Sequence, residues 1–257
     1  MQIEKDELEI LAGVRHGRSL GSPLAVLIRN TEWQRWSQEM SPQTGEPKRL
    51  MTTPRPGHAD LAGMLKYDTH DARNILERAS ARETAARTVA GYAARQLLRR
   101  VGISVLSHVV AIGSIEVPPG TTPGLDDLDT IDQSPVRAFD KSAESAMIDA
   151  VEQAKTDRDT LGGVVEVLAF GSPPGLGSHV HWDRRLDTQV AGALMSIPGI
   201  KAVEIGDGFA SASRRGSDAH DEIGYEDGRF VRATDRAGGL DLPWGHRGRG
   251  WSTDTSR

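Results

Sequence analysis

The sequence predicts an α+β fold, and three observations support this prediction. Two long segments, residues 81–99 and 141–157, place apolar residues at the spacing of an amphipathic helix. Short apolar runs that are typical of strands alternate with these helices along the chain. A glycine-rich turn between the first two apolar runs indicates a hairpin, which argues against a purely parallel sheet.

The first part of the chain predicts a hairpin followed by a long loop. Residues 7–12 alternate between polar and apolar, residues 24–28 form a second apolar run, and glycines punctuate residues 13–23 between them. Residues 38–57 are polar and rich in Pro and Thr, which predicts a loop. Loops of this length are more often functional than structural.

The remaining elements alternate between helices and strands. Ser80 and Glu83 form a capping-box motif that begins the first long helix, whose apolar stripe consists mostly of small residues, and Gly102 ends that helix. We expect a strand at 103–112, an acidic loop at 118–132, a helix at 141–157, a strand at 164–170, a helix at 186–196 and a strand at 200–205. Residues 241–257 show no apolar periodicity, so we expect them to lie outside the packed domain formed by residues 1–240.

Composition excludes several classes of protein. The chain has 257 residues, of which 37% are hydrophobic, and this is enough apolar material for a real core. A net charge of −5 argues against a general binder of nucleic-acid backbones. The absence of cysteine excludes disulfides, thiolate metal sites and cysteine nucleophiles. The acidic start, Met1–Glu7, and the lack of a long apolar run predict a cytoplasmic protein without a membrane segment.

The segment Arg55-Pro56-Gly57-His58-Ala59-Asp60 follows the long loop directly and is the first candidate site. Pro and Gly fix a turn, and an imidazole exposed there could act as an acid or base near neutral pH. The alternative is an ordinary surface histidine in a loop-to-helix turn, with Asp60 capping the helix. Spacing alone favours this alternative.

The second candidate is the segment Arg78-Ala79-Ser80-Ala81-Arg82 at the start of the first long helix. A helix N-terminus offers unpaired amides and a positive dipole end, so two neighbouring arginines would complete an anion site. The alternative is that Ser80 only caps the helix and that both arginines are solvated. Arginine opposes the dipole at this position, so a counter-charge is expected, and a phosphate would supply one.

Two further segments carry weaker signals. His179, His181 and Asp183 would share one face of a strand, but no fourth metal ligand is evident, so solvated loop residues are the favoured interpretation. The glycine-rich stretch 171–177 lacks the spacing of a phosphate-binding loop and is interpreted as a turn.

Taken together, many short segments in unbroken order resemble the chorismate synthase family. The similarity covers about residues 7–240, and the number of matching segments makes it specific. The matching segments are Gly13-Val14-Arg15-His16-Gly17 with Gly21-Ser22-Pro23, Asn30-Thr31-Glu32-Trp33, Arg55-Pro56-Gly57-His58-Ala59-Asp60, Lys66-Tyr67, Asp71-Ala72-Arg73, Glu77-Arg78-Ala79-Ser80-Ala81-Arg82-Glu83-Thr84, Asp159-Thr160-Leu161-Gly162-Gly163, Lys201-Ala202-Val203-Glu204-Ile205-Gly206-Asp207-Gly208-Phe209 and Arg236-Ala237-Gly238-Gly239.

The resemblance implies a lyase of the shikimate pathway, which leads to the aromatic amino acids. Its substrate would be 5-enolpyruvylshikimate 3-phosphate, converted to chorismate and phosphate by a 1,4-anti elimination that requires reduced FMN without net redox change. The resemblance also implies a βαβ sandwich assembled as a homotetramer, with NADPH as a reductant of the flavin. Such chemistry requires a dry pocket, cations on the phosphate and an imidazole beside the flavin.

The resemblance assigns roles to individual residues. His58 would be the catalytic histidine that protonates the reduced flavin, and Arg55 and Arg82 would bind the anionic groups of the substrate.

Arg78, Ala79 and Ser80 would contact FMN, as would Pro198 and Gly199. At the last two positions relatives usually carry a polar residue followed by alanine, and Pro198 offers no amide donor. The resemblance implies no metal ligands.

The family pattern extends beyond this sequence at both ends. The family's first histidine segment and its first substrate-binding arginines precede the matching region, and a Gly- and Met-rich flavin-binding stretch is replaced here by an Arg-, Gly- and Trp-rich tail. We therefore expect a partial chain, with the tail arising from a change of frame or an incorrect gene end. Two hypotheses follow. Either the chain retains the lyase activity, or it is a non-catalytic remnant that binds flavin or a full-length partner.

Overall fold

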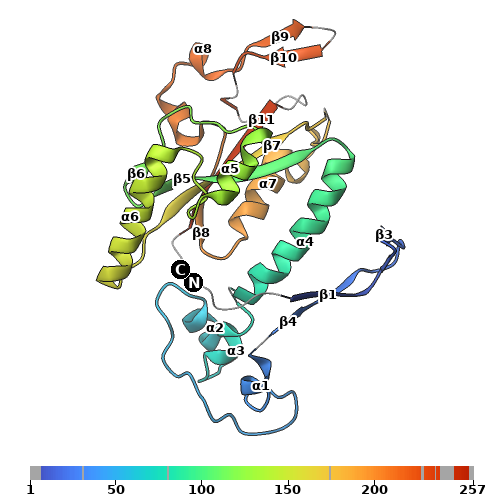
Figure 1. Cartoon of the computed structure of the whole chain (residues 1–257), viewed down its shortest axis with the longest axis vertical. Coiled ribbons are helices and arrows are strands. Elements are labelled where there is room, and N and C mark those ends of the chain that lie inside the picture. Colours follow the sequence, from blue (N-terminus) through green and yellow to red (C-terminus); the bar gives the residue numbers. More distant parts are fainter. Residues whose placement is uncertain are drawn as a thin grey trace. The chain divides into compact units, whose positions relative to one another are not determined.

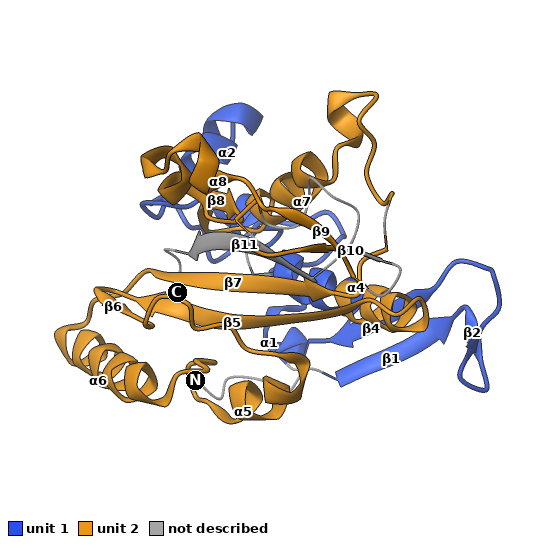
Figure 2. Cartoon of the chain, turned by 90° about the horizontal axis from the view of Figure 1, so that it is seen from above, with its two compact units in different colours: residues 1–90 blue, residues 91–257 orange. Residues whose placement is uncertain are grey.

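The structure is a computed structural model that describes residues 7–30, 32–79, 81–173, 175–226, 229–234, 236–237 and 246–254. The chain forms two compact units, residues 1–90 and 91–257, coloured separately in Figure 2. The single domain expected over residues 1–240 stays a prediction, and the boundary between the two compact units falls after Ala90. The two units are described one at a time.

Unit 1 begins with the predicted hairpin, which is confirmed. Strand β1 (Glu7–Ala12) pairs antiparallel with β4 (Ala25–Arg29), and a small inner hairpin of β2 (Val14–Arg15) and β3 (Arg18–Ser19) lies in the connection. Gly13 has a φ of +89°, and a Cβ at this position would lie 2.5 Å from the carbonyl oxygen of Pro23. Glycine is therefore required where the connection leaves β1.

The rest of unit 1 is helical apart from the long loop. Helix α1 (Trp33–Trp36) precedes the loop, and α2 (Asp60–Tyr67) and α3 (Arg73–Leu76) follow it (Figure 1). Helix α4 (Ala81–Arg100) comes next and runs past Ala90 into unit 2. The close approach of α2 and α3 depends on Gly63, because a Cβ there would lie 2.3 Å from Cγ1 of Ile75. The predicted loop is confirmed, since residues 41–59 contain no helix or strand.

Helix α4 is confirmed with bounds close to those predicted, although the residue expected to cap it, Ser80, lies outside the described residues. Its apolar residues are largely exposed: Tyr92 retains 66% and Leu97 retains 68% of its accessible surface. Gly102, with a φ of +81°, ends the helix, and the Ile103 amide donates to the carbonyl of Leu98 over 2.9 Å. This is the left-handed termination that the sequence predicts.

Unit 2 contains a five-stranded sheet in the order β6-β5-β7-β11-β8 (Figure 1). All neighbouring strands are antiparallel, in agreement with the predicted α+β class. The strands are β5 (Ser104–Ile112), β6 (Ile115–Glu116), β7 (Gly163–Phe170), β8 (Ile200–Ile205) and β11 (His246–Asp254).

Strand β11 corrects the expectation for residues 241–257. Residues 246–254 of this tail pair with β7 on one side and with β8 on the other. Strand pairing uses backbone N–H and C=O groups, which any segment without proline supplies, so a tail without apolar periodicity can still form a strand. The residues on either side of this strand, 241–245 and 255–257, lie outside the described residues.

The segment 118–132 was expected to be an acidic loop, but its second half is helical. A short 3₁₀ turn, η1 (Leu125–Asp127), leads into α5 (Leu128–Gln133). The Asp127 carboxylate accepts a hydrogen bond from the Gly124 amide over 2.7 Å, and Ile131 is fully buried against Leu106 and Leu168. Burial of one isoleucine thus outweighs the polar character of its neighbours.

The second long predicted helix is confirmed as α6 (Lys141–Asp157). The Asp140 carboxylate accepts a hydrogen bond from the Ala143 amide over 2.8 Å and caps its N-terminus. Ala143 and Met147 are buried beside Ala138 and form the core on this side of the unit. The remaining elements are η2 (Trp182–Arg184), α7 (Leu186–Met195), η3 (Gly208–Ser213), α8 (Gly216–Ala219), β9 (Ile223–Glu226) and β10 (Arg229–Arg232).

The turn after β7 generates a stability prediction. Gly171 has a φ of +73°, and a Cβ there would lie 2.2 Å from the carbonyl oxygen of Gly102. Gly175 has a similar φ of +86°, but no atom lies within 4 Å of its Cβ position. Gly171→Ala should therefore lower the free energy of unfolding by about 2–4 kcal/mol, because backbone strain and a backbone clash add. Gly175→Ala should cost about 1 kcal/mol, from strain alone.

Urea unfolding of both variants, followed by circular dichroism, measures the difference. Equal losses of stability in the two variants would contradict the close approach of Gly171 to Gly102.

Candidate functional site

The loop ends in a turn that presents His58 to solvent. Gly57 adopts a φ of +72°, and the exposed His58 follows it, two residues before α2 begins. Nδ1 of His58 lies 2.9 Å from the carbonyl oxygen of Pro56. A carbonyl oxygen only accepts, so Nδ1–H is the donor and Nε2 is left as the ring nitrogen that can exchange a proton with a ligand.

Arg55 and Asp60 form an ion pair across this turn. The Asp60 carboxylate accepts hydrogen bonds from Arg55 Nε over 2.8 Å, from Nη2 over 3.0 Å and from the Arg55 amide over 3.1 Å. Asp60 is completely buried, whereas the Arg55 side chain is 36% exposed. The side-chain hydrogen bond from Arg55 holds the pKa of Asp60 below its usual value, against the effect of burial.

This geometry corrects the interpretation of Asp60 as a helix cap. The N-cap of α2 is Ala59, without a side-chain cap, and Asp60 is the first helical residue. Its carboxylate is directed at Arg55 instead. The bidentate contact fixes the plane of the guanidinium, and the pair holds Arg55 charged by raising its pKa.

Arg78 and Arg82 flank the start of α4, and each already has a carboxylate partner. Arg78 Nη1 lies 2.7 Å from Glu83, and Arg82 Nη1 lies 2.8 Å from Glu77. Glu83 also accepts a hydrogen bond from Arg87 Nε over 3.0 Å. The counter-charge that the sequence analysis required is thus supplied by glutamates. Both arginines nevertheless remain well exposed, at 77% and 54%.

The other residues predicted to contact a cofactor lie in different surroundings. The amide of Ala79 donates to the carbonyl of Ile75 over 3.0 Å, and Ser80 lies outside the described residues. Pro198 and Gly199 connect α7 to β8 in unit 2, whereas the other predicted site residues belong to unit 1. Gly199 has a φ of +95°, so this turn favours glycine.

The histidine segment near residue 180 is an exposed loop leading into η2. His179, His181 and Asp183 are all exposed. Within the part of the chain that the structure describes, no group of three or more His, Asp or Glu side chains is arranged to hold a metal ion. In the same described part, no helix is both long and apolar enough to cross a membrane.

A cavity of about 240 Å³ lies in unit 2. Strands β5, β6, β7 and β8 line it, and its charged lining residues are Glu116 and Glu204. None of the predicted site residues lines this cavity. A cavity edged by two carboxylates is poorly suited to an anionic ligand.

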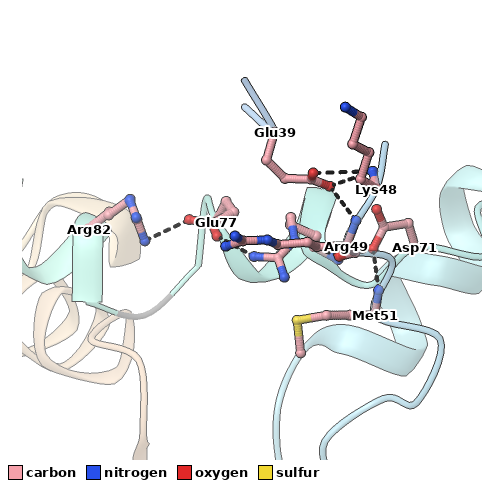
Figure 3. Close-up of polar contacts among 8 residues, drawn as sticks. Glu39, Lys48, Arg49, Met51, Asp71, Glu77 and Arg82 are labelled. Carbon is pink, nitrogen blue, oxygen red and sulfur yellow. Dashed lines mark hydrogen bonds and ion pairs between the residues drawn. The ribbon is translucent and has the colours of Figure 1, made fainter. Parts of the chain in front are cut away.

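The sequence analysis missed a polar network that anchors the long loop. The Asp71 carboxylate accepts hydrogen bonds from the amides of Met51 and Arg73, both over 3.0 Å, and the Ala72 amide donates to the carbonyl of Met51 over 2.8 Å. Glu39 accepts from the amides of Lys48 and Arg49 (Figure 3). These contacts fix the loop at both ends of the span 39–51.

Arg73, the first residue of α3, connects this network to Glu77. Its Nε donates to the carbonyl of Arg49 over 3.2 Å, its guanidinium carbon lies 4.8 Å from the centre of the Trp36 ring, and its Nη1 donates to Glu77 over 3.1 Å. Only the four-residue spacing of Arg73 and Glu77 was visible in the sequence as a signal of this ion pair.

Unit 1 therefore carries cations and an imidazole on the segments around the long loop. Arg55 is anchored on a buried carboxylate, and His58 stands exposed three residues later. Arg78 and Arg82 begin α4 with exposed guanidiniums. Exposed guanidiniums can bind an anionic ligand, and the exposed imidazole can transfer a proton.

Comparison with known proteins finds relatives over most of this chain. The family model described as chorismate synthase matches residues 1–242. Chorismate synthase of Frankia casuarinae is 56% identical over 253 residues, which cover 94% of this chain and 64% of that protein. Chorismate synthase of Saccharopolyspora erythraea is 57% identical over 252 residues and covers 94% and 63%. The chain thus spans somewhat less than two thirds of the length of these curated relatives.

A solved structure supports the same relationship. A crystal structure of chorismate synthase superposes with a TM-score of 0.81 at 38% sequence identity. The match covers 97% of this chain and 71% of that chain. The fold expected from the resemblance is confirmed by this superposition.

The Arg55–Asp60 ion pair generates a prediction on pH and stability. Asp60→Asn removes the buried charge that Arg55 contacts, so it should lower the free energy of unfolding at pH 7 by about 2–4 kcal/mol. Because the pKa of Asp60 is lowered in the folded protein, its stabilisation is complete above the pKa of the unfolded aspartate, about 3.9. It is lost as the pH falls further, through the lowered pKa.

Denaturant titrations of both proteins between pH 2 and pH 7 measure this effect. The difference in stability between wild type and Asp60→Asn should be constant down to roughly pH 4 and should shrink below it. A difference that stays constant throughout the acid range would rule out the assigned role of the ion pair.

Proposed function

The chain belongs to the chorismate synthase family, and on that premise we propose that it converts 5-enolpyruvylshikimate 3-phosphate to chorismate and phosphate. The reaction breaks the bond between the ring carbon and the phosphate oxygen, which releases phosphate, and removes the C6 hydrogen as a net proton to solvent, so that a ring double bond forms without net redox change. The observation that carries the proposal is the turn 55–60, where an exposed imidazole with one fixed nitrogen follows an anchored arginine.

Arg55 and Arg82 are proposed to bind the anionic groups of the substrate. A guanidinium has five N–H donors, and Asp60 occupies only two of those of Arg55. The remaining donors can hydrogen-bond a carboxylate or phosphate without breaking the ion pair. Negative charge collects on the departing phosphate, so a fixed cation beside it lowers the barrier more than it stabilises the bound substrate.

His58 is proposed as the proton-transfer residue. Its Nδ1–H is held by the Pro56 carbonyl over 2.9 Å, so the proton that moves is the one on Nε2. The turn at Gly57 presents the ring to solvent and hence to a ligand. In this role His58 holds a proton at Nε2 and delivers it to the reduced cofactor.

Among the residues assigned to the cofactor, Arg78 and Gly199 offer hydrogen-bond donors to FMN. The exposed Arg78 guanidinium lies beside the start of a 20-residue helix and suits the FMN phosphate. Pro198 offers only its carbonyl oxygen, so at that turn the amide of Gly199 is the one backbone donor of the pair. Reduced FMN, when bound, supplies electron density to the elimination, and NADPH is the proposed source of its reduction.

The proposal extends to assembly and location. A homotetramer is supported by the exposed apolar side chains of α4, Tyr92 and Leu97, which a partner subunit would cover. The net charge of −5 supports a small-molecule substrate rather than a nucleic acid. A cytoplasmic location, without a membrane partner, rests on the family's place in the biosynthesis of aromatic amino acids.

An anaerobic assay of the purified 257-residue chain tests the proposal. With 5-enolpyruvylshikimate 3-phosphate and reduced FMN, chorismate and phosphate should appear in equal amounts. The same assay without flavin is the control and should yield neither product. Flavin binding without any chorismate would contradict the proposed activity and would support the non-catalytic alternative.

His58→Ala should lower kcat by about 10²–10⁴-fold while the substrate still binds, because the variant loses proton transfer and retains the arginines. Steady-state kinetics and a substrate titration measure the two effects separately. His181→Ala, an exposed histidine in unit 2, is the matched control and should leave kcat unchanged. An unchanged kcat in His58→Ala would remove His58 from the mechanism.

A further inference from the structure

Glu77 occupies the position between the loop network and Arg82. One of its carboxylate oxygens, Oε1, accepts a hydrogen bond from Arg73 Nη1 over 3.1 Å, and the other, Oε2, lies 2.8 Å from Arg82 Nη1. In Figure 3 Glu77 stands between Arg82 and the loop residues Arg49 and Met51. We propose that Glu77 is a positioning residue that holds the Arg82 guanidinium ready for the anionic substrate, an inference that rests on the proposed function.

Glu77 is itself held in place by Arg73. Its side chain is 13% exposed and that of Arg73 is 11% exposed. Arg73 in turn has three further contacts: the carbonyl of Arg49, the Trp36 ring and, through its amide, Asp71. A carboxylate bonded to an arginine that is fixed on several sides has little freedom to follow a moving partner.

Arg82 depends on Glu77 for its orientation. Arg82 is 54% exposed, and Glu77 is its ion-pair partner among the described residues. An exposed arginine samples many rotamers, and ordering it on ligand binding weakens affinity. The contact uses one Nη1–H of five donors, so the rest of the guanidinium stays available to an anion.

The charge of the Arg73, Glu77 and Arg82 cluster also suits an anionic substrate. A carboxylate paired with a single arginine would cancel the charge that attracts an anionic substrate. Here one carboxylate serves two arginines, so Arg73, Glu77 and Arg82 together keep a net charge of +1. The pairing therefore orders Arg82 and leaves the cluster attractive to phosphate and carboxylate groups.

Asp71, which holds the amide of Arg73, also holds the part of the loop that leads to Arg55. Asp71 holds the amides of both Met51 and Arg73, and the chain reaches Arg55 four residues after Met51. The end of the loop and the guanidinium of Arg82 are thus fixed by neighbouring residues of one segment, 71–77. A change at Glu77 frees Arg82, whereas Asp71 continues to hold the loop.

A double-mutant cycle tests the proposal on the full chain with four proteins: wild type, Glu77→Gln, Arg82→Ala and the double variant. Glu77→Gln should raise KM for the substrate roughly threefold to tenfold, the cost of ordering one long side chain, and should change kcat by less than about twofold. In the Arg82→Ala background the same substitution should have no further effect on KM. Glu152→Gln, which breaks an exposed pair with Lys155 on α6, is the matched control and should leave KM unchanged.

Three kinetic outcomes would overturn the proposal. One is an equal rise in KM whether or not Arg82 is present, which would show that Glu77 acts independently of Arg82. Another is a lowered KM in Glu77→Gln, which would show that Glu77 competes with the substrate. A third is an unchanged KM in a folded Glu77→Gln protein.

A measurement that needs neither turnover nor a variant of Glu77 completes the test. The Nε–H resonance of Arg82 in ¹⁵N-labelled protein, identified by its loss in Arg82→Lys, should show the relaxation of an ordered side chain in the absence of substrate. Rapid internal motion of this group would overturn the proposal even if Glu77→Gln failed to fold. Absence of chorismate formation by the wild type would instead count against the proposed function and would leave this result valid.

Discussion

The ion pair between Arg55 and Asp60 is the constraint on which the proposed site depends. It joins the last residues of a long loop to the first residue of α2, and so it decides where the loop ends. Burial of Asp60 makes the contact obligatory, because a buried carboxylate without a cation is strongly unfavourable. The turn between the two residues presents His58, whose ring is fixed by the carbonyl of Pro56. One ion pair therefore fixes Arg55 and the turn that carries His58, the proposed proton-transfer residue.

Much of the fold could be predicted because its signals are local. Helix α6 carries its periodicity and its Asp140 cap in adjacent residues, and the hairpin of β1 and β4 has its turn between its strands. Helix α5 was missed because its stability comes from the burial of Ile131 against residues of distant strands. Strand β11 was missed because pairing between backbones leaves no pattern of side chains to detect.

The candidate site also contains residues that the sequence reveals and contacts that it does not. His58 and Arg55 could be found from a short segment and a family resemblance, but the bond between Arg55 and Asp60 could not, since an aspartate at a helix start equally suggests a cap. The resemblance assigned a role to Arg82 and none to its partner Glu77, because their ion pair depends on how the chain turns between the end of α3 and the start of α4. Arg73 lay in a matching segment without an assigned role, and its four-residue spacing from Glu77 was the signal of their ion pair.

The contacts of Arg73 have a consequence for the comparison of relatives. Its Nε donates to a backbone carbonyl, its Nη1 donates to a carboxylate, and its guanidinium carbon lies 4.8 Å from the centre of an indole ring. A planar guanidinium makes these three contacts at once from separate atoms, whereas a lysine at this position has one ammonium group and could not reach all three partners together. An alignment that scores arginine and lysine as equivalent would therefore treat the loss of this anchor as a silent change.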